Sequence, residues 1–126
     1  MIKHIVMWKV RGDDPTTRGH NLTLLRAEFE SLRGRIPGLL HLEVGIDESR
    51  IDYAFDVVLV TEFASREALA AYAEHPEHLR VRRALGDLRT ARHQVDYEVF
   101  SPPLPAGDVA GHPGITGDKH HVQAVR

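Results

Sequence analysis

The sequence of 126 residues contains no cysteine. A disulfide framework, a thiolate nucleophile and a cysteine-ligated metal are therefore all excluded. Neither sign of charge is in excess, since the net charge is −2, and this argues against a nucleic-acid binder that works by neutralising phosphates. No apolar run reaches the length of a membrane span or of a signal-peptide core. We therefore expect a cytoplasmic protein that binds neither nucleic acid nor a membrane.

Strand-like and helix-like patterns alternate over residues 1–100. Hydrophobic residues make up 42% of the chain, which is enough for one modest core. After Pro15 they step by three and four residues, which predicts an amphipathic helix. The predicted elements are strands at 2–10, 40–46, 53–63 and 92–100, a helix ending near Gly34, a helix from Ser65 that Pro76 interrupts, and a helical segment from Pro76 to about Thr90. This β-α-β-β-α-β order predicts an α+β fold of the ferredoxin-like kind.

Residues 101–126 differ in composition from the rest of the chain. Repeated prolines and glycines there exclude a regular helix or strand. We therefore divide the chain into a domain at 1–100 and a Pro/Gly-rich C-terminal tail at 101–126. The tail is expected to wrap around the domain or around a partner subunit.

The predicted sheet carries apolar side chains on both faces, although the helices of such a fold cover only one. The apolar residues expected on the uncovered face are Ile5, Met7, Val58, Val60, Val95, Tyr97 and Val99. An exposed patch of this size is unfavourable on a monomer, so we predict a homodimer whose two sheets pack face to face. Coverage by the tail, or strand registers other than those assumed, are the alternatives.

The most specific string in the sequence runs from Tyr72 to His78. Its tyrosine and two histidines are spaced three residues apart, which clusters them on one side of a helix. His4 shares the helix-facing side of the first strand with Trp8. A phenol and imidazoles converging on one cavity can perform general acid–base chemistry, because histidine titrates near neutral pH. In the structural alternative, His75 caps a helical turn, His4 bonds to the backbone and Tyr72 belongs to the core.

The same residues give little support for a metal ion. His4, His75 and His78 could supply three nitrogens to zinc, but no zinc-binding spacing is present, and we expect neither a metal nor a cofactor. If the side chains of Arg92 and Gln94 lie on the helix-facing side of the last strand, they would make a cavity between the helices and the sheet polar. Such a cavity suits a carboxylate or another anion. A surface position at the start of the strand is the alternative for Arg92.

Four motifs of the sequence resemble those of a known family. They are the opening Ile2-Lys3-His4-Ile5-Val6, then Phe63-x-Ser65, then Tyr72-x-x-His75-Pro76-x-His78, and the closing Val95-Asp96-Tyr97. Together they resemble the stress-responsive A/B barrel (Dabb) domain family over about residues 1–100. The resemblance implies a ferredoxin-like protomer and a homodimer whose sheets form an α/β barrel. In a branch that cyclises polyketides by a cofactor-free aldol step, the histidine matching His78 is the base, the tyrosine matching Tyr72 assists it, and a histidine matching His4 lines the pocket.

Departures from the cyclase branch change the expected ligand. A pocket histidine of that branch falls on Val57, and aromatic or aliphatic pocket positions fall on Arg26, Arg89 and Arg92. Arginines do not suit an alkyl tail, so we expect a small anionic or carbonyl ligand between helices and sheet. The candidate catalytic residues are His78, Tyr72 and His4, and the candidate ligand-binding residues are His75, Trp8 and Arg92. Three functions stay open: ligand binding without chemistry, cyclase-like enolisation with His78 as base, and cofactor-free oxygenation, as in related dimeric barrels.

Overall fold

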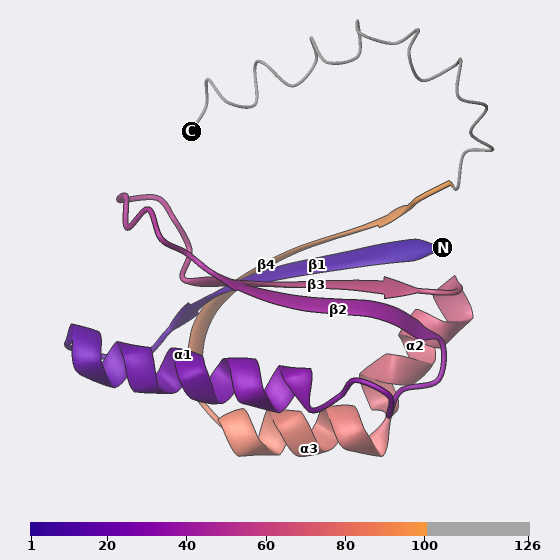
Figure 1. Cartoon of the computed structure of the whole chain (residues 1–126), viewed down its shortest axis with the longest axis horizontal. Coiled ribbons are helices and arrows are strands. Elements are labelled where there is room, and N and C mark those ends of the chain that lie inside the picture. Colours follow the sequence, from indigo (N-terminus) through magenta and orange to yellow (C-terminus); the bar gives the residue numbers. More distant parts are fainter. Residues whose placement is uncertain (101–126) are drawn as a thin grey trace, which may run out of the picture.

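A single antiparallel sheet with three helices on one of its faces forms the domain (Figure 1). The computed structural model describes residues 1–100. Its elements are β1 (Ile2–Val10), α1 (Pro15–Glu30), β2 (Leu39–Ile46), β3 (Val57–Phe63), α2 (Arg66–Glu74), α3 (Pro76–Leu85) and β4 (Arg89–Glu98). The sheet order is β2-β3-β1-β4. The predicted α+β ferredoxin-like fold is confirmed, and the predicted role of the tail lies outside the described residues.

The third strand begins at Val57, whereas the sequence pattern predicted a start at residue 53. Asp56 lies at this boundary, and its backbone N–H donates to the Trp8 carbonyl at 3.0 Å. Its buried carboxylate accepts a hydrogen bond from the backbone N–H of Val10 at 2.7 Å and pairs with the Arg50 guanidinium at 3.1 Å. The residues before Asp56 form a loop.

Three other predicted boundaries are wrong by several residues. Helix α1 ends at Glu30, and turns follow it over residues 31–35. Helix α3 ends at Leu85 because Gly86 adopts a φ of 51°, in the region that favours glycine. The chain can then enter β4 at Arg89, earlier than the predicted residue 92.

The core lies between the helices and the covered face of the sheet. Its largest contacts include Trp8 of β1 stacked on Phe29 of α1, with ring centroids 5.1 Å apart. The other fully buried apolar side chains are Val6, Leu25, Leu32, Leu59, Phe63 and Val81. Burial of side chains of this size contributes roughly 1.5–3 kcal/mol each, so this layer holds α1 and α3 on the sheet.

Pro76 separates α2 from α3, at the position where the sequence predicted an interruption. His75 has an extended backbone, as expected for a residue before proline. Its Nδ1 accepts the backbone N–H of Glu77 at 3.0 Å and so caps the start of α3. The chain turns at this point, and α3 runs beside α1 (Figure 1).

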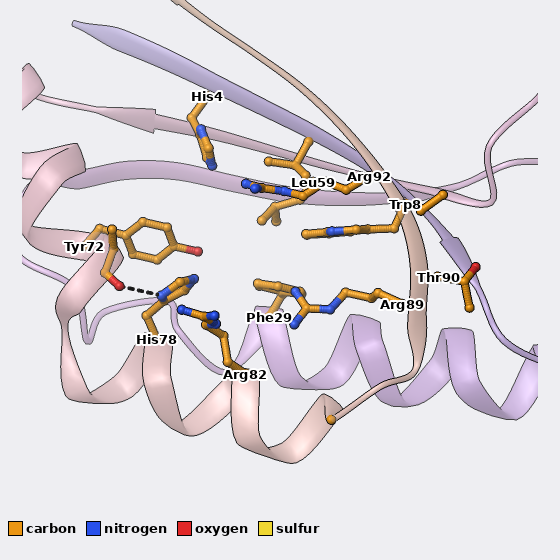
Figure 2. Close-up of a pocket in the computed structure, with 14 residues that line it drawn as sticks. His4, Trp8, Phe29, Leu59, Tyr72, His78, Arg82, Arg89, Thr90 and Arg92 are labelled. Carbon is orange, nitrogen blue, oxygen red and sulfur yellow. Dashed lines mark hydrogen bonds between the residues drawn. The ribbon is translucent and has the colours of Figure 1, made fainter.

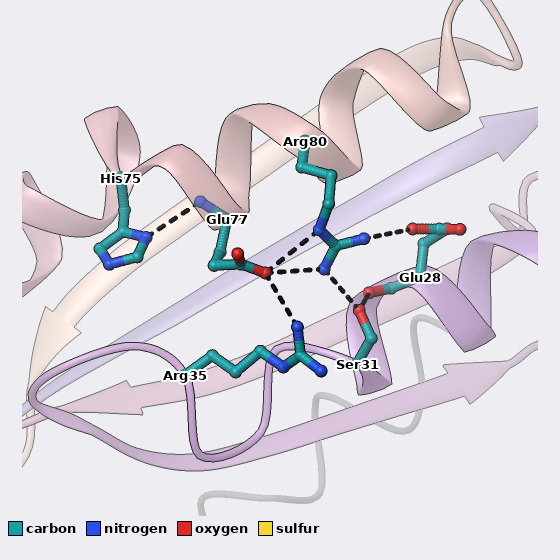
Figure 3. Close-up of polar contacts among 6 residues, drawn as sticks. All are labelled: Glu28, Ser31, Arg35, His75, Glu77 and Arg80. Carbon is teal, nitrogen blue, oxygen red and sulfur yellow. Dashed lines mark hydrogen bonds and ion pairs between the residues drawn. The ribbon is translucent and has the colours of Figure 1, made fainter.

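A polar cluster ties α3 to the end of α1 (Figure 3). Arg80 donates to Glu28 at 3.1 Å, to Glu77 at 3.1 Å and to Ser31 at 2.9 Å. Arg35 also reaches the Glu77 carboxylate, at 3.4 Å. We call these five residues the Arg80 clamp. It fixes the start of α3 relative to α1.

The uncovered face of the sheet is apolar, as the sequence predicted. The strand register places Ile5 opposite both Val60 and Val95. Met7 is 39% exposed, Val95 56% and Tyr97 46%. We call this surface the open face. No helix among residues 1–100 combines the length and the apolar composition that a bilayer crossing requires.

Candidate functional site

A cavity of about 560 Å³ opens between α3 and the half of the sheet formed by β1 and β4. Figure 2 shows its side chains converging from both helices and strands. The polar and aromatic residues that line it are His4 and Trp8 of β1, Phe29 of α1, Tyr72 of α2, His78 and Arg82 of α3, and Arg89, Thr90 and Arg92 of β4. Its volume lies within the range of small-molecule sites, about 300–1,000 Å³.

His78 is oriented by a backbone carbonyl. Its Nδ1 lies 3.1 Å from the Ala73 oxygen, which can only accept a hydrogen bond, so Nδ1 carries the hydrogen. The neutral ring therefore keeps its lone pair on Nε2. Burial, together with the positive charges of Arg82 and Arg89, lowers the pKa of His78 below its ordinary value of 6.5, although the bond to Ala73 partly opposes this. The ring is therefore an unprotonated base at neutral pH.

Tyr72 stands beside this base. The ring centroids of Tyr72 and His78 are 4.3 Å apart, and the Tyr72 hydroxyl points into the cavity (Figure 2). Burial raises the pKa of Tyr72 to about 12, with the charges of Arg89 and Arg92 acting in the opposite direction. Tyr72 therefore remains a hydrogen-bond donor over the physiological pH range.

His4 is buried and held by a carboxylate. Its Nδ1 donates to Asp96 Oδ1 at 2.6 Å, across the β1–β4 pairing. Gln94 donates to the other Asp96 oxygen at 3.0 Å, and Arg92 donates to the Gln94 side-chain carbonyl. A chain of polar side chains thus runs along the helix-facing side of β4 and ends on His4, whose ring leans toward the cavity (Figure 2).

Asp96 is the residue that sequence reasoning missed. It was part of the closing motif, but no role was derived for it. The alternation of side chains along the last strand could have indicated its position. Residues two apart on a strand share a face, and Asp96 follows Arg92 and Gln94 at that spacing. The register opposite His4 completes the pairing.

The arginines of the cavity are not neutralised by acids. Arg89 lies over the Trp8 ring, 5.2 Å from its centroid. Burial lowers the pKa of Arg89, and the nearby charges of Arg82 and Arg92 lower it further. Within residues 1–100, no carboxylate forms an ion pair with any of these three arginines.

Five of the six sequence-predicted site residues line the cavity. They are His4, Trp8, Tyr72, His78 and Arg92. His75 does not line it, because its imidazole accepts the Glu77 N–H and caps the start of α3. Among the positions that depart from the cyclase branch, Arg89 and Arg92 line the cavity, whereas Val57 lies in the core and Arg26 is exposed on α1. His4, His75 and His78 do not form a metal-ligand cluster, and no group of three or more metal-ligating side chains occurs among residues 1–100.

The family model for the Stress Responsive A/B Barrel Domain, Dabb, matches residues 2–99. This chain belongs to the Dabb family. The match spans every helix and strand of the described fold. The cavity residues from His4 to Asp96 therefore all lie within the Dabb domain. No curated protein matches the chain.

Solved structures share the fold of this Dabb domain. One is a dimeric protein with a ferredoxin-like fold from Bacteroides fragilis, at 29% identity and a TM-score of 0.70, covering 78% of this chain and 95% of that one. A Dabb family protein with a ferredoxin-like fold from Mesorhizobium loti has 20% identity and a TM-score of 0.63, covering 79% and 97%. A third structure, an antibiotic biosynthesis monooxygenase, has 19% identity and a TM-score of 0.60, covering 80% and 100%. At the identity of the last two, the likeness concerns the fold alone.

Proposed function

We propose that this Dabb domain binds a small anionic carbonyl compound in the cavity and catalyses a cofactor-independent proton transfer on it. The observation that carries the proposal is the fixed orientation of His78, whose Nδ1 is engaged by the Ala73 carbonyl at 3.1 Å. A histidine held in this way has one unprotonated nitrogen available, and a pKa below 6.5 keeps it unprotonated at neutral pH.

In the proposed step, His78 removes a proton from the carbon beside the carbonyl group. The C–H bond breaks, its electron pair moves into the carbon framework, and the carbonyl oxygen becomes an enolate oxygen. Tyr72 donates a hydrogen bond to that oxygen, which stabilises the charge that develops on it. His78 leaves the step as an imidazolium. It can return the proton to another atom, or the enolate can attack a second carbonyl of the same molecule and form a ring.

His4 is proposed to assist by holding the ligand on the sheet side of the cavity. Asp96 keeps its ring in one orientation through Nδ1, so Nε2 faces the ligand. This arrangement supports a third position for hydrogen bonding beside Tyr72 and His78, and it needs no metal ligand or nucleophile from the chain.

Proton exchange tests the function without knowledge of the natural substrate. The protein is incubated in D₂O with a panel of β-oxo acids, and loss of the α-proton signal is followed by NMR. We expect exchange above the buffer rate with wild-type protein and with His20→Gln, which changes an exposed histidine of α1. Exchange that stays unchanged in His78→Gln would contradict the proposal.

Binding without chemistry is the second candidate, and the unpaired arginines favour it as well. The panel separates the two functions: ligands that bind by calorimetry but show no exchange with the wild-type protein indicate a binding protein. Oxygen uptake in the same reactions tests the cofactor-free oxygenase alternative, for which no residue of the cavity gives specific support.

We also propose that the chain forms a homodimer through the open face. Support comes from the exposure of Val95 and Tyr97, 56% and 46%, and from the dimeric Bacteroides fragilis protein at 29% identity. Val95→Asp should give a monomer by light scattering, because a buried unpaired charge opposes association. Leu24→Asp is the matched control, since Leu24 is 41% exposed on α1, away from this surface. A wild-type monomer would contradict the proposal.

A further inference from the structure

The geometry points to a ligand with two separate carboxylates, of the oxo-dicarboxylate class. This inference rests on the proposed function, because it names the substrate class of the same cavity. It starts from charge. Among residues 1–100, the cavity lining contains Arg82, Arg89 and Arg92, and no aspartate or glutamate. Asp96, the acidic residue beside the cavity, is already engaged by His4 and Gln94.

All three arginines line the same cavity, Arg89 half-buried and Arg82 and Arg92 exposed at its rim. Three like charges around one cavity repel one another unless a counter-charge lies between them. Arg80 and Arg35 of the same domain differ, because both bond to the Glu77 carboxylate. The missing negative charge of the cavity is therefore supplied by the ligand.

The placement of the three arginines favours two anionic groups over one. Arg82 projects from α3, one turn beyond His78, while Arg89 lies flat against Trp8 near the start of β4. Arg92 enters from the sheet side (Figure 2). A single carboxylate can serve two guanidinium groups, as Glu77 does for Arg35 and Arg80, but three forks that approach from different elements are better matched by two anionic groups.

The remaining walls suit a short carbon skeleton between those groups. Trp8, Phe29 and Leu59 form an apolar surface on one side. Tyr72 and His78 lie on the other side, where the proposed enolate oxygen and the transferred proton would be. An enolisable carbonyl between two carboxylates matches this distribution of apolar, acid–base and cationic groups.

Calorimetry with four probes tests the charge requirement on the full chain. The probes are glutarate and 3-oxoglutarate, each with two carboxylates, and butyrate and acetoacetate, each with one. The comparison is made within two pairs, glutarate with butyrate and 3-oxoglutarate with acetoacetate. In each pair we expect the dicarboxylate to bind at least 10-fold more tightly at low ionic strength, and this difference to shrink as salt is added. Equal affinities within each pair would overturn the inference.

Two neighbouring arginines of α3 provide a matched pair of variants. Both are exposed on the helix, but Arg82 lines the cavity and Arg83 does not. We expect Arg82→Gln to weaken glutarate binding about 10- to 100-fold, as loss of a charge-assisted hydrogen bond does, and Arg83→Gln to leave it unchanged. Equal losses in both variants would show a general effect of net charge and would overturn the inference.

Inorganic phosphate separates two sources of negative charge. A ligand whose charge resides in one phosphate group would make phosphate the tighter probe, and phosphate binding tighter than glutarate would overturn the assignment to two carboxylates.

The variant His78→Gln distinguishes the proposed substrate class from the proposed reaction. If this variant binds glutarate normally and the wild-type protein catalyses no proton exchange, the substrate class stands and the proposed reaction fails. If 3-oxoglutarate exchanges but shows no preference over acetoacetate, the reaction stands and the substrate class fails.

Discussion

Arg80 and Arg82 lie two residues apart on α3 and differ in almost every contact. Arg80 belongs to the Arg80 clamp and bonds to Glu28, Glu77 and Ser31 (Figure 3). Arg82 lines the cavity, where no carboxylate of residues 1–100 pairs with it (Figure 2). The comparison teaches that residue type alone does not separate a structural arginine from a ligand-binding one. Arg80 has acidic partners within the protein, whereas Arg82 lies on the cavity wall, where a ligand is proposed to bind.

The two histidines of the same segment repeat the pattern. His75 uses Nδ1 to accept the Glu77 N–H and caps α3, whereas His78 uses Nδ1 to donate to Ala73 and turns its other nitrogen toward the cavity. One side of this segment therefore holds the helix in place, and the other side carries the proposed chemistry.

The largest expected effect is on the cavity side. His78→Gln should lower the rate of catalysed α-proton exchange by about 10²- to 10⁴-fold, the usual contribution of a general base. The thermal midpoint should change little, because glutamine can retain the bond to Ala73. The control is His75→Gln, which should affect stability more than rate. A large loss of stability in His78→Gln would break the division between the two sides of α3.

Tyr72→Phe should lower the exchange rate by about 10²-fold, since it removes one donor to the developing oxyanion. The ring of Tyr72 is buried against Phe63, with centroids 5.0 Å apart, and phenylalanine preserves this packing. Kinetics that separate KM from kcat provide the measurement. A change in KM alone would mean that the hydroxyl contributes to binding but not to the transition state.

Arg80→Gln should act in the opposite way and affect stability. We expect the thermal midpoint to fall by about 2–5 °C, which is modest because exposed ion pairs contribute little individually. Arg83→Gln is the control, because Arg83 is exposed and lies outside the clamp. If Arg80→Gln instead abolished exchange at unchanged stability, Arg80 would act on His78 and the clamp would not be purely structural.

The smallest expected effect is a pH dependence of stability that comes from His78. Its pKa is lowered in the folded state, mainly by burial, so the unfolded chain binds more protons below the ordinary pKa of 6.5. The stabilisation from neutral His78 is therefore fully present above pH 6.5 and is lost as the pH falls through the lowered pKa. Urea denaturation across this interval should give a shallower fall for His78→Gln than for wild type. Identical pH profiles would mean that His78 is not desolvated.

Much of the fold and part of the site could be predicted from residue patterns. Alternation in β1 correctly placed His4 and Trp8 on the helix-facing side, and the motif between Tyr72 and His78 pointed to these two residues, which line the cavity. The role of His75 was less accessible, because whether an imidazole caps a helix or faces a cavity depends on the backbone turn at Pro76. The contact between His4 and Asp96 joins residues 92 positions apart, and only the β1–β4 register brings them together.

The sequence by itself determined the order of the elements, the apolar character of both sheet faces and the family of the chain, because these depend on local periodicity and short motifs. Only the tertiary structure decided which charged residues have partners. The packing of α3 against α1 brings Arg80 to Glu28, and the turn at Gly86 brings Arg89 back toward Arg82. Charge pairing is a property of distances between elements, and a pattern along one element does not contain those distances.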